Sequence, residues 1–465
     1  MTALGARPSP AGLEDVVAHL DRNAGRWIDV LSEFIRMPSR TGELEEVRAC
    51  ASWIAGVLGA GGFEAELVDP GHGAPVVLAT IDGPPGAPRL LLYSHYDVIS
   101  PEPVEAWSFP PFGAVREDGR IYGRGSTDAK ANVLALVNAA IAFREVRGHP
   151  PCGLTLILDG EEEAGSNNLP EFLEVARGSL AADAVLSFDG AIDPSGRPKI
   201  GLGTSGMLFV ELRVPGAARE LHSAAARIYP NPAWRLVWAL ASIKGPDERV
   251  AIAGFDDPIR PADETDQRMM AEMGWDGTAW IREAGVDGFL LGLEGTAALE
   301  RLLFQPGLAL SGLDAGYTGP GMKAIIPSGA TAKLEFRIVP DQEPETVLGQ
   351  LRAHLDRHGF SDVAIEVLAT VETARTDPTD PIVDVLVEAA REVYGDAMVK
   401  PTEEYAGRQG AWLGRRLGLP GVQTGVGPPG AHSHATDEFV TEEHYLAGIR
   451  YAAAIMEGYA RQSRS

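Results

Sequence analysis

The first 200 residues alternate between helix-like and strand-like spacings of apolar positions. Helical periodicity runs over about 13–37, before Pro38, and again over 43–58. Four short runs rich in Leu, Val and Ile follow, with the sequences VVLATI, RLLLYS, LTLILD and AVLSF. Such runs, bounded by turn residues, are typical of buried strands in an α/β sheet. A further helix is expected from Asp128 to about Phe143, with Asp128 as its N-cap.

The pattern changes at about Thr204. The segments MLFVELRV, TAKLEFRIV and DVAIEVLATV have partial strand-like alternation, and ETVLGQLRAHLDRHG is an amphipathic helix. Extra helices are expected within 244–305. Helices return after about Asp380, with the strand VQTGV and a last helix. This order predicts an α/β catalytic domain in two parts, 1–203 and 379–465, interrupted by a smaller α+β sandwich at 204–378.

Composition narrows the classes of function. The chain has 465 residues, which favours two domains, and its net charge of −25 argues against nucleic-acid and anionic membrane partners. Its two cysteines, Cys50 and Cys152, exclude a disulfide scaffold and a Cys-rich zinc site. We see no secretion signal and no apolar run long enough to span a bilayer, so a cytoplasmic location is expected.

Acidic and imidazole side chains follow several of the predicted strands. They are His95 and Asp97 after RLLL, Glu161, Glu162 and Glu163 after LTLIL, Asp189 after AVL, and His432 and His434 after VQTGV. The carboxyl ends of strands in an open α/β sheet meet at one crevice, so these residues are expected to lie together.

Each motif alone has an ordinary structural explanation. A histidine near an aspartate is often structural, three glutamates are often a solvated loop, and Asp128 could simply cap its helix. Several carboxylates at one sheet edge, however, would repel one another without a cation. Histidine and carboxylate ligands without cysteine suit a catalytic divalent metal such as zinc.

These motifs together resemble the dinuclear zinc exopeptidases. The strings YSHYDVISP, WSFPPF, GRGSTDAK, EEEAGS, LSFDG and HSHATDE occur in the order and spacing of that family. Its members include aminoacylase, carnosinase-type dipeptidases, glutamate carboxypeptidase, acetylornithine deacetylase and succinyl-diaminopimelate desuccinylase. The resemblance covers nearly the whole chain. It implies a zinc-exopeptidase-like catalytic domain, two divalent metal ions (zinc, with cobalt or manganese as alternatives), and an inserted lid and dimerisation domain.

The resemblance also implies roles for single residues. His95 matches a metal ligand, and Asp97 matches the carboxylate that orients its ring. Asp128 matches the carboxylate that bridges both metals. Glu162 takes the position of the general base, and Glu163 that of a metal ligand.

The remaining ligands follow in the same way, with one choice left open. Asp189 matches a ligand to the first metal, and Glu161 is left as a neighbour. The family often places its last histidine four residues before a glutamate, which from Glu438 gives His434. Alignment on Gly-Ala-His-Ser instead gives His432. We favour His434.

The inserted domain adds two residues by the same resemblance, and a third residue near one of them. His222 in ELHSAA matches a loop histidine that reaches the oxyanion, in many relatives from the partner subunit. Asn231 lies near that loop, and we expect it to contact the substrate. Arg337 takes the position that anchors the substrate carboxylate, to which its planar fork is suited. Ala324 stands where dipeptidase relatives often have Thr, and EYAGRQGAW replaces their Gly-Gly-Ser turn, so dipeptide specificity is in question.

The sequence therefore predicts a homodimeric, metal-dependent hydrolase of amide bonds in dipeptides or N-acyl amino acids with a free carboxylate. An N-carbamoyl or N-acetyl amino-acid hydrolase is a close alternative with the same chemistry. A non-catalytic binding protein would be expected to have lost a ligand or the base, and none is missing here. An amide-forming or otherwise diverted enzyme is suggested only by the altered EYAGRQ turn.

Overall fold

The computed structural model describes residues 9–407 and 410–462, and these divide into two compact units. The first unit comprises Met1–Leu202, Thr376–Lys400 and Arg408–Ser465, and the second comprises Gly203–Arg375 and Pro401–Gly407. The second unit is thus an insertion in the first. The short segment Pro401–Gly407 belongs with the insertion, although the sequence analysis grouped it with the second part of the catalytic domain.

An eight-stranded sheet runs through the first unit. Its strands, in spatial order, are β1 (Glu64–Val68), β2 (Val76–Ile81), β6 (Gly153–Asp159), β3 (Arg89–His95), β7 (Ala184–Ala191), β18 (Gly421–Gly427), β8 (Lys199–Gly201) and β16 (Met398–Lys400). Strand β3 is parallel to both β6 and β7, and β18 is parallel to β7. The carboxyl ends of these four strands therefore lie at the same edge of the sheet.

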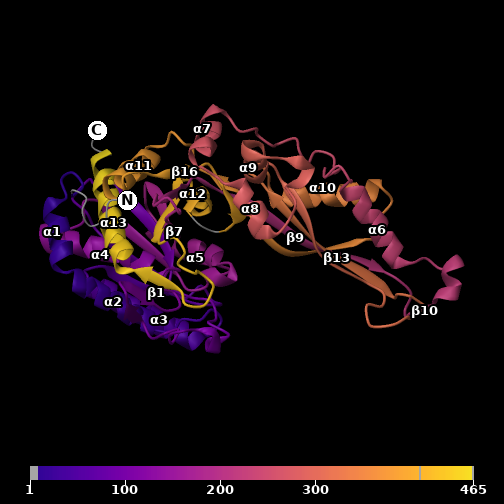
Figure 1. Cartoon of the computed structure of the whole chain (residues 1–465), viewed down its shortest axis with the longest axis horizontal. Coiled ribbons are helices and arrows are strands. Elements are labelled where there is room, and N and C mark those ends of the chain that lie inside the picture. The colour runs from indigo at the N-terminus through magenta and orange to yellow at the C-terminus, as the bar shows by residue number, and fades with distance from the viewer. Residues whose placement is uncertain (1–8, 408–409, 463–465) are drawn as a thin grey trace. The chain divides into compact units, whose positions relative to one another are not determined.

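Helices pack around this sheet. They are α1 (Glu14–Arg22), α2 (Ala24–Arg36), α3 (Leu44–Ala60), α4 (Lys130–Arg147), α5 (Leu169–Ala176), α11 (Pro381–Tyr394), α12 (Gly410–Leu417) and α13 (Glu442–Gln462). Helix α4 is buried at every position from Lys130 to Phe143 and packs beside α13 (Figure 1). Its apolar positions surround the helix, which explains why it sits in the interior rather than on the surface.

Two details differ from the sequence prediction. The helix expected over 13–37 is two helices that break at Asn23, whose side-chain amide donates to the carbonyl of His19 and competes with the helical bonds. The prediction that Asp128 caps its helix is wrong. Helix α4 begins at Lys130, its N-cap is Ala129, and no side chain caps it. The Asp128 carboxylate bonds to histidines instead.

The second unit is built on an antiparallel sheet. Its main strands, in spatial order, are β11 (Gly307–Ala315), β13 (Gly329–Ile338), β9 (Gly203–Pro215) and β14 (Ala364–Val371), with β15 (Ala374–Arg375) and β17 (Glu403–Ala406) also pairing with β9. Helices α6 (Pro232–Ile243) and α10 (Pro344–Arg357) supply apolar residues to the core on this sheet. The side chains of β13 alternate between buried and more exposed, as expected when one face of a sheet is covered.

The extra helices expected in 244–305 are present. They are α7 (Glu264–Glu272), α8 (Gly277–Ala284) and α9 (Gly295–Phe304). Residues of α7 and α9 form a small apolar cluster of their own, which includes Met270, Leu299 and Leu303.

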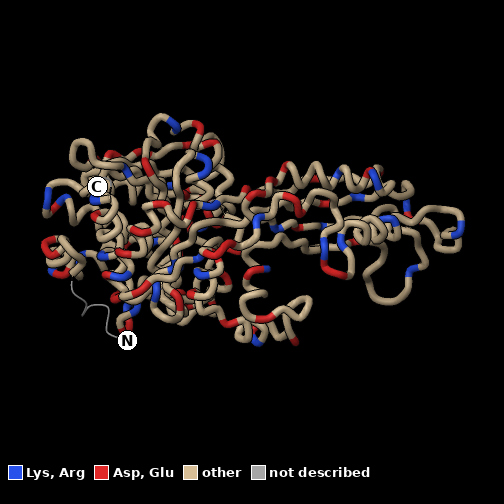
Figure 2. The backbone as a smooth tube through the Cα atoms, turned by 90° about the horizontal axis from the view of Figure 1, so that it is seen from above, with Lys and Arg blue, Asp and Glu red and all other residues tan. Residues whose placement is uncertain are grey.

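Charged residues of both signs are interspersed along the backbone of each unit (Figure 2). Within 9–407 and 410–462, no helix has the length and apolar character needed to cross a membrane.

Candidate metal centre and active site

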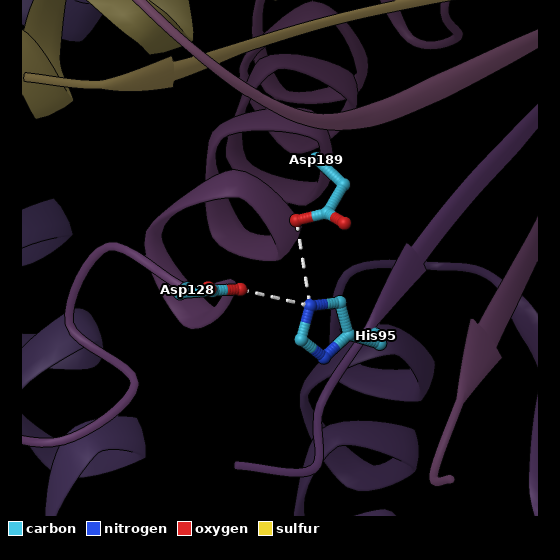
Figure 3. A group of neighbouring side chains, drawn as sticks. All are labelled: His95, Asp128 and Asp189. Carbon is cyan, nitrogen blue, oxygen red and sulfur yellow. Dashed lines mark hydrogen bonds and ion pairs between the residues drawn. The ribbon is translucent and has the colours of Figure 1, made fainter. Parts of the chain in front are cut away.

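The centre is built on His95, the last residue of β3. Its side chain is fully buried, and its Nε2 atom lies 3.1 Å from Oδ1 of Asp128 and 3.4 Å from Oδ1 of Asp189. Figure 3 shows both carboxylates directed at the same ring nitrogen. Asp189 comes from β7, the parallel neighbour of β3, whereas Asp128 comes from the loop before α4. The sheet edge thus assembles three donors that lie far apart in the sequence.

A second group of donors shares Asp128 with the first. The Nε2 atom of His434 lies 3.2 Å from Oδ2 of Asp128 and 3.1 Å from Oε2 of Glu163. The two oxygens of Asp128 therefore face different histidines. One donor atom from each residue of a group lies within 4.8 Å of the others, both for His95, Asp128 and Asp189 and for Asp128, Glu163 and His434.

This donor set fits two divalent cations that share one carboxylate. Imidazole nitrogens and carboxylate oxygens suit zinc and related divalent metals. The clustering of acids also carries an electrostatic cost that a cation would remove. Burial and the neighbouring carboxylates raise the pKa of Glu162 to about 8, and burial with repulsion from Asp128 and Glu163 raises the pKa of Asp189.

The pKa values of the two histidines are also raised, whereas that of the shared aspartate is lowered. Burial alone would lower the pKa of His95, but the carboxylates of Asp189 and Asp128 raise it well above its ordinary value. Hydrogen bonds to Asp128 and Glu163 raise the pKa of His434 to about 10. Although burial opposes it, bonding to the two histidines lowers the pKa of Asp128. Positive charge at this place is therefore favoured.

Asp97 connects the first histidine to the acidic loop. Its Oδ1 lies 3.3 Å from Nδ1 of His95, and its oxygens accept backbone N–H bonds from Glu162 at 3.1 Å and Glu163 at 3.2 Å. The hydroxyl of Thr41 donates to the same carboxylate at 2.8 Å. Asp97 is thus placed to orient both the His95 ring and the two glutamates. Nothing in the sequence around Thr41 indicates this contact.

A second carboxylate, Glu438, fixes the loops that carry Asp128 and His434. Glu438 is fully buried and accepts a hydrogen bond from the Arg124 guanidinium at 2.6 Å. It also accepts bonds from the backbone N–H groups of Gly125, Thr127 and Asp128 at 3.0, 2.9 and 3.1 Å. The pairing of β19 (Phe439–Thr441) with β5 (Arg120–Tyr122) brings these two segments together. In the sequence, Glu438 serves only to locate the histidine.

The structure places the two candidate histidines differently. His434 lies in the group with Asp128 and Glu163, whereas the ring of His432 packs edge-on against Phe439 at a centroid distance of 5.9 Å. Both residues have positive φ angles, 60° and 62°, in the loop after β18. The geometry therefore favours His434 as the ligand.

The three remaining candidates belong to the second unit. His222, on β10 (Leu221–His222), is exposed, and its Nδ1 accepts the N–H of Ala224 at 3.1 Å. Asn231 caps α6 by accepting the N–H of Ala233 at 2.9 Å. Arg337, on β13, is partly exposed, and its Nε lies 2.6 Å from Glu335. A structural role for Asn231 is thus evident, and its predicted role in substrate binding stays a prediction. In the EYAGRQ turn, Arg408 and Gln409 lie outside the described residues.

Comparison with known proteins places this centre in a family. The model of peptidase family M20/M25/M40 matches residues 91–458. Among curated proteins, the Beta-Ala-His dipeptidase of Rattus norvegicus is 26% identical over 387 residues, covering 78% of each chain. The Cys-Gly metallodipeptidase of Saccharomyces cerevisiae is 24% identical over 404 residues, covering 83% of this chain and 82% of the relative.

Solved structures match this chain over nearly its full length. An M20 family metallo-carboxypeptidase from Sulfolobus solfataricus superposes with a TM-score of 0.83 and 30% identity, covering 94% of this chain and 99% of that chain. Human carnosine dipeptidase 1 shares the fold, with a TM-score of 0.72 and 23% identity over 97% of this chain and 100% of that chain. The expected fold, an α/β catalytic sheet with an inserted α+β unit, is confirmed.

The fold and the two groups of metal-donor side chains together define a dinuclear metal hydrolase with an inserted sheet domain. The chain belongs to peptidase family M20/M25/M40 and is a metallopeptidase. The expectation of a metal-dependent hydrolase of peptide or related amide bonds in small substrates is confirmed at that level.

Proposed function

We propose that the chain hydrolyses dipeptides and similar N-acyl amino acids that carry a free carboxylate, with two zinc ions held by His95, Asp128, Asp189, Glu163 and His434. The observation that carries this proposal is the division of the two carboxylate oxygens of Asp128 between two histidines. Relatives named as dipeptidases and carboxypeptidases support the substrate class. When bound, such ions supply Lewis acidity and lower the pKa of a water toward about 7.

Glu162 is proposed as the general base. The backbone N–H of Glu162 donates to the carboxylate of Asp97, which holds this residue next to Glu163. Positive charge placed beside these carboxylates lowers the raised pKa of Glu162. Glu162 accepts a proton from the attacking water and returns it to the leaving nitrogen. Asp97 keeps the His95 ring in the orientation that presents Nε2 to the cation.

The second unit supplies the substrate contacts in this proposal. His222 donates a hydrogen bond to the developing oxyanion, and Arg337 holds the carboxylate of the leaving amino acid. Asn231 lies beside the loop of His222 and supports substrate binding there. A homodimer, in which His222 acts across the interface, extends the proposal, and the cytoplasmic location stays a prediction from the sequence.

A hydrolysis panel tests the proposal. Purified protein loaded with zinc, cobalt or manganese would be given dipeptides, N-acetyl amino acids and N-carbamoyl amino acids, with and without chelator. We expect dipeptide hydrolysis that chelation abolishes and zinc restores. Hydrolysis restricted to N-acetyl or N-carbamoyl substrates would replace the dipeptidase assignment with the alternative, and metal-independent turnover would refute both.

Two neighbouring glutamates provide a matched test of the base. We expect Glu162→Gln to lower kcat by about 10²- to 10⁴-fold while metal analysis shows both ions retained. Glu161→Gln is the control, because Glu161 is the adjacent glutamate to which no role in catalysis or metal binding is assigned, and like Glu162 it lies outside both groups of donors among the described residues. Equal activity of the two variants would remove Glu162 from this role.

A further inference from the structure

A pocket of about 890 Å³ lies within the second unit. One wall comes from β11 and β13 and includes Leu308 and Arg337. Another comes from the segment 275–293, which follows α7 and contains α8. The volume is within the range of small-molecule sites, about 300–1,000 Å³. The pocket is thus large enough to enclose the side chain of an amino acid together with its carboxylate.

The wall from segment 275–293 is aromatic. The ring of Trp275 stacks on Phe289 at a centroid distance of 5.6 Å, and Trp280 meets Trp275 edge-on at 5.7 Å. Gly277 permits this packing, because a Cβ there would lie 2.8 Å from the Trp275 ring and 3.1 Å from Phe289. Offset and edge-to-face pairs of this kind form a stable apolar surface.

Apolar side chains at this wall remain open to solvent. Leu290 and Leu291 are 58% and 59% exposed, and Trp280 is 42% exposed, although all three line the pocket. Leu291 has a φ angle of 59°, a conformation that is costly for a branched side chain. Strain and exposed apolar area concentrated at one concave site are typical of a ligand-binding surface.

The wall from β11 and β13 carries a cation that lines the same pocket. Within the described residues, Arg337 has one ion pair, formed through its Nε with Glu335, and its side chain is 42% exposed. Its two terminal nitrogens therefore remain for a ligand carboxylate, which an Arg fork can bind bidentately. The pocket thus combines an anion-binding group with an aromatic wall, and a molecule that satisfies both carries a carboxylate next to a large apolar group.

We propose that this pocket selects the amino acid that leaves with the free carboxylate, and that it favours a bulky apolar or aromatic side chain. This inference rests on the proposed role of Arg337 in substrate binding. The carboxylate lies on Arg337, and the side chain lies against Trp280 and Leu290. Burial of an aromatic side chain against this wall favours it over a methyl group by about 10- to 100-fold.

The kinetic test compares dipeptides that differ only in the C-terminal residue. We expect kcat/KM for Ala-Phe to exceed that for Ala-Ala by at least about 10-fold. Trp280→Ala and Leu290→Ala should each lower the ratio of the Ala-Phe value to the Ala-Ala value by about 10-fold. Val286→Ala is the matched control, because Val286 lies in the same segment, is 51% exposed and does not line the pocket.

A binding measurement separates this inference from the proposed function. Calorimetric titration of the protein with phenylalanine and with alanine requires no turnover. If phenylalanine binds more tightly than alanine and Trp280→Ala abolishes the difference, the pocket assignment is supported even when no dipeptide is cleaved. In that case only the proposed function fails. Equal binding of the two amino acids, or dipeptide cleavage with equal kcat/KM for Ala-Phe and Ala-Ala, would overturn the pocket assignment and leave the metal centre unaffected.

Discussion

Removing the carboxylate of Glu438 is expected to weaken the metal centre more than any other change that leaves the proposed metal ligands intact. One of its oxygens accepts from Arg124 and Gly125, and the other accepts from Thr127 and Asp128. In Glu438→Gln one of these positions becomes an NH₂ group, which cannot accept a hydrogen bond. Two buried donors then lose their acceptor, and the Arg124 guanidinium, 3% exposed, loses its counter-charge.

The magnitude follows from these losses. Each buried donor left without an acceptor costs about 1–3 kcal/mol, and breaking a buried ion pair costs about 3–5 kcal/mol. Because these contributions overlap, we expect Glu438→Gln to lower the free energy of unfolding by about 3–5 kcal/mol. The loop of Asp128 loses its anchor as well, so metal affinity should fall by about 10- to 100-fold.

The assay is denaturant unfolding with chelator present, followed by calorimetric titration of zinc into the refolded apoprotein. Glu442→Gln serves as control, because Glu442 pairs with Arg116 at 2.7 Å on a partly exposed surface. Such exposed pairs contribute about 0–1 kcal/mol. If Glu438→Gln were as stable as this control and bound zinc as tightly as the wild type, the anchoring role assigned to Glu438 would be wrong.

Two further perturbations test the second unit. Gly277→Ala should destabilise the second unit by about 1–3 kcal/mol, because the added methyl group collides with the Trp275 ring. The near-ultraviolet circular dichroism spectrum should lose aromatic signal as well. An unchanged spectrum and an unchanged stability would contradict the packing described. Arg375→Ala should cost about 3–5 kcal/mol, because it leaves the fully buried carboxylate of Asp266 without its counter-charge. Chemical denaturation would show this against Lys323→Ala, which breaks a half-exposed pair with Glu220 and should cost less than about 1 kcal/mol; equal losses would argue against a buried pair.

Local patterns in the chain were sufficient for most of the secondary structure. The runs VVLATI, RLLLYS, LTLILD and AVLSF correspond to β2, β3, β6 and β7, because short apolar runs of branched residues form strands wherever both faces are covered. The order of acids and histidines after these strands also indicated one shared site. The rule that parallel strands end at the same edge is enough to bring His95 and Asp189 together.

Side chains in loops could not be placed in this way. His432 and His434 stand two residues apart in one loop, and only the folded loop directs one of them to Asp128 and the other to Phe439. The residues around Asp128 predict that it caps a helix. Its carboxylate instead faces two histidines that are distant in the sequence.

The Glu438 anchor and the aromatic pocket depend still more on long-range contacts. The partners of Glu438 lie more than 300 residues away, and the pocket joins Arg337 to a wall about 50 residues earlier in the chain. Apolar periodicity depends on residues that are close together in the sequence, so it can be recognised from the sequence alone. The direction of a polar side chain is chosen by hydrogen bonds and charges that meet only when the chain has folded, so it becomes visible only in three dimensions.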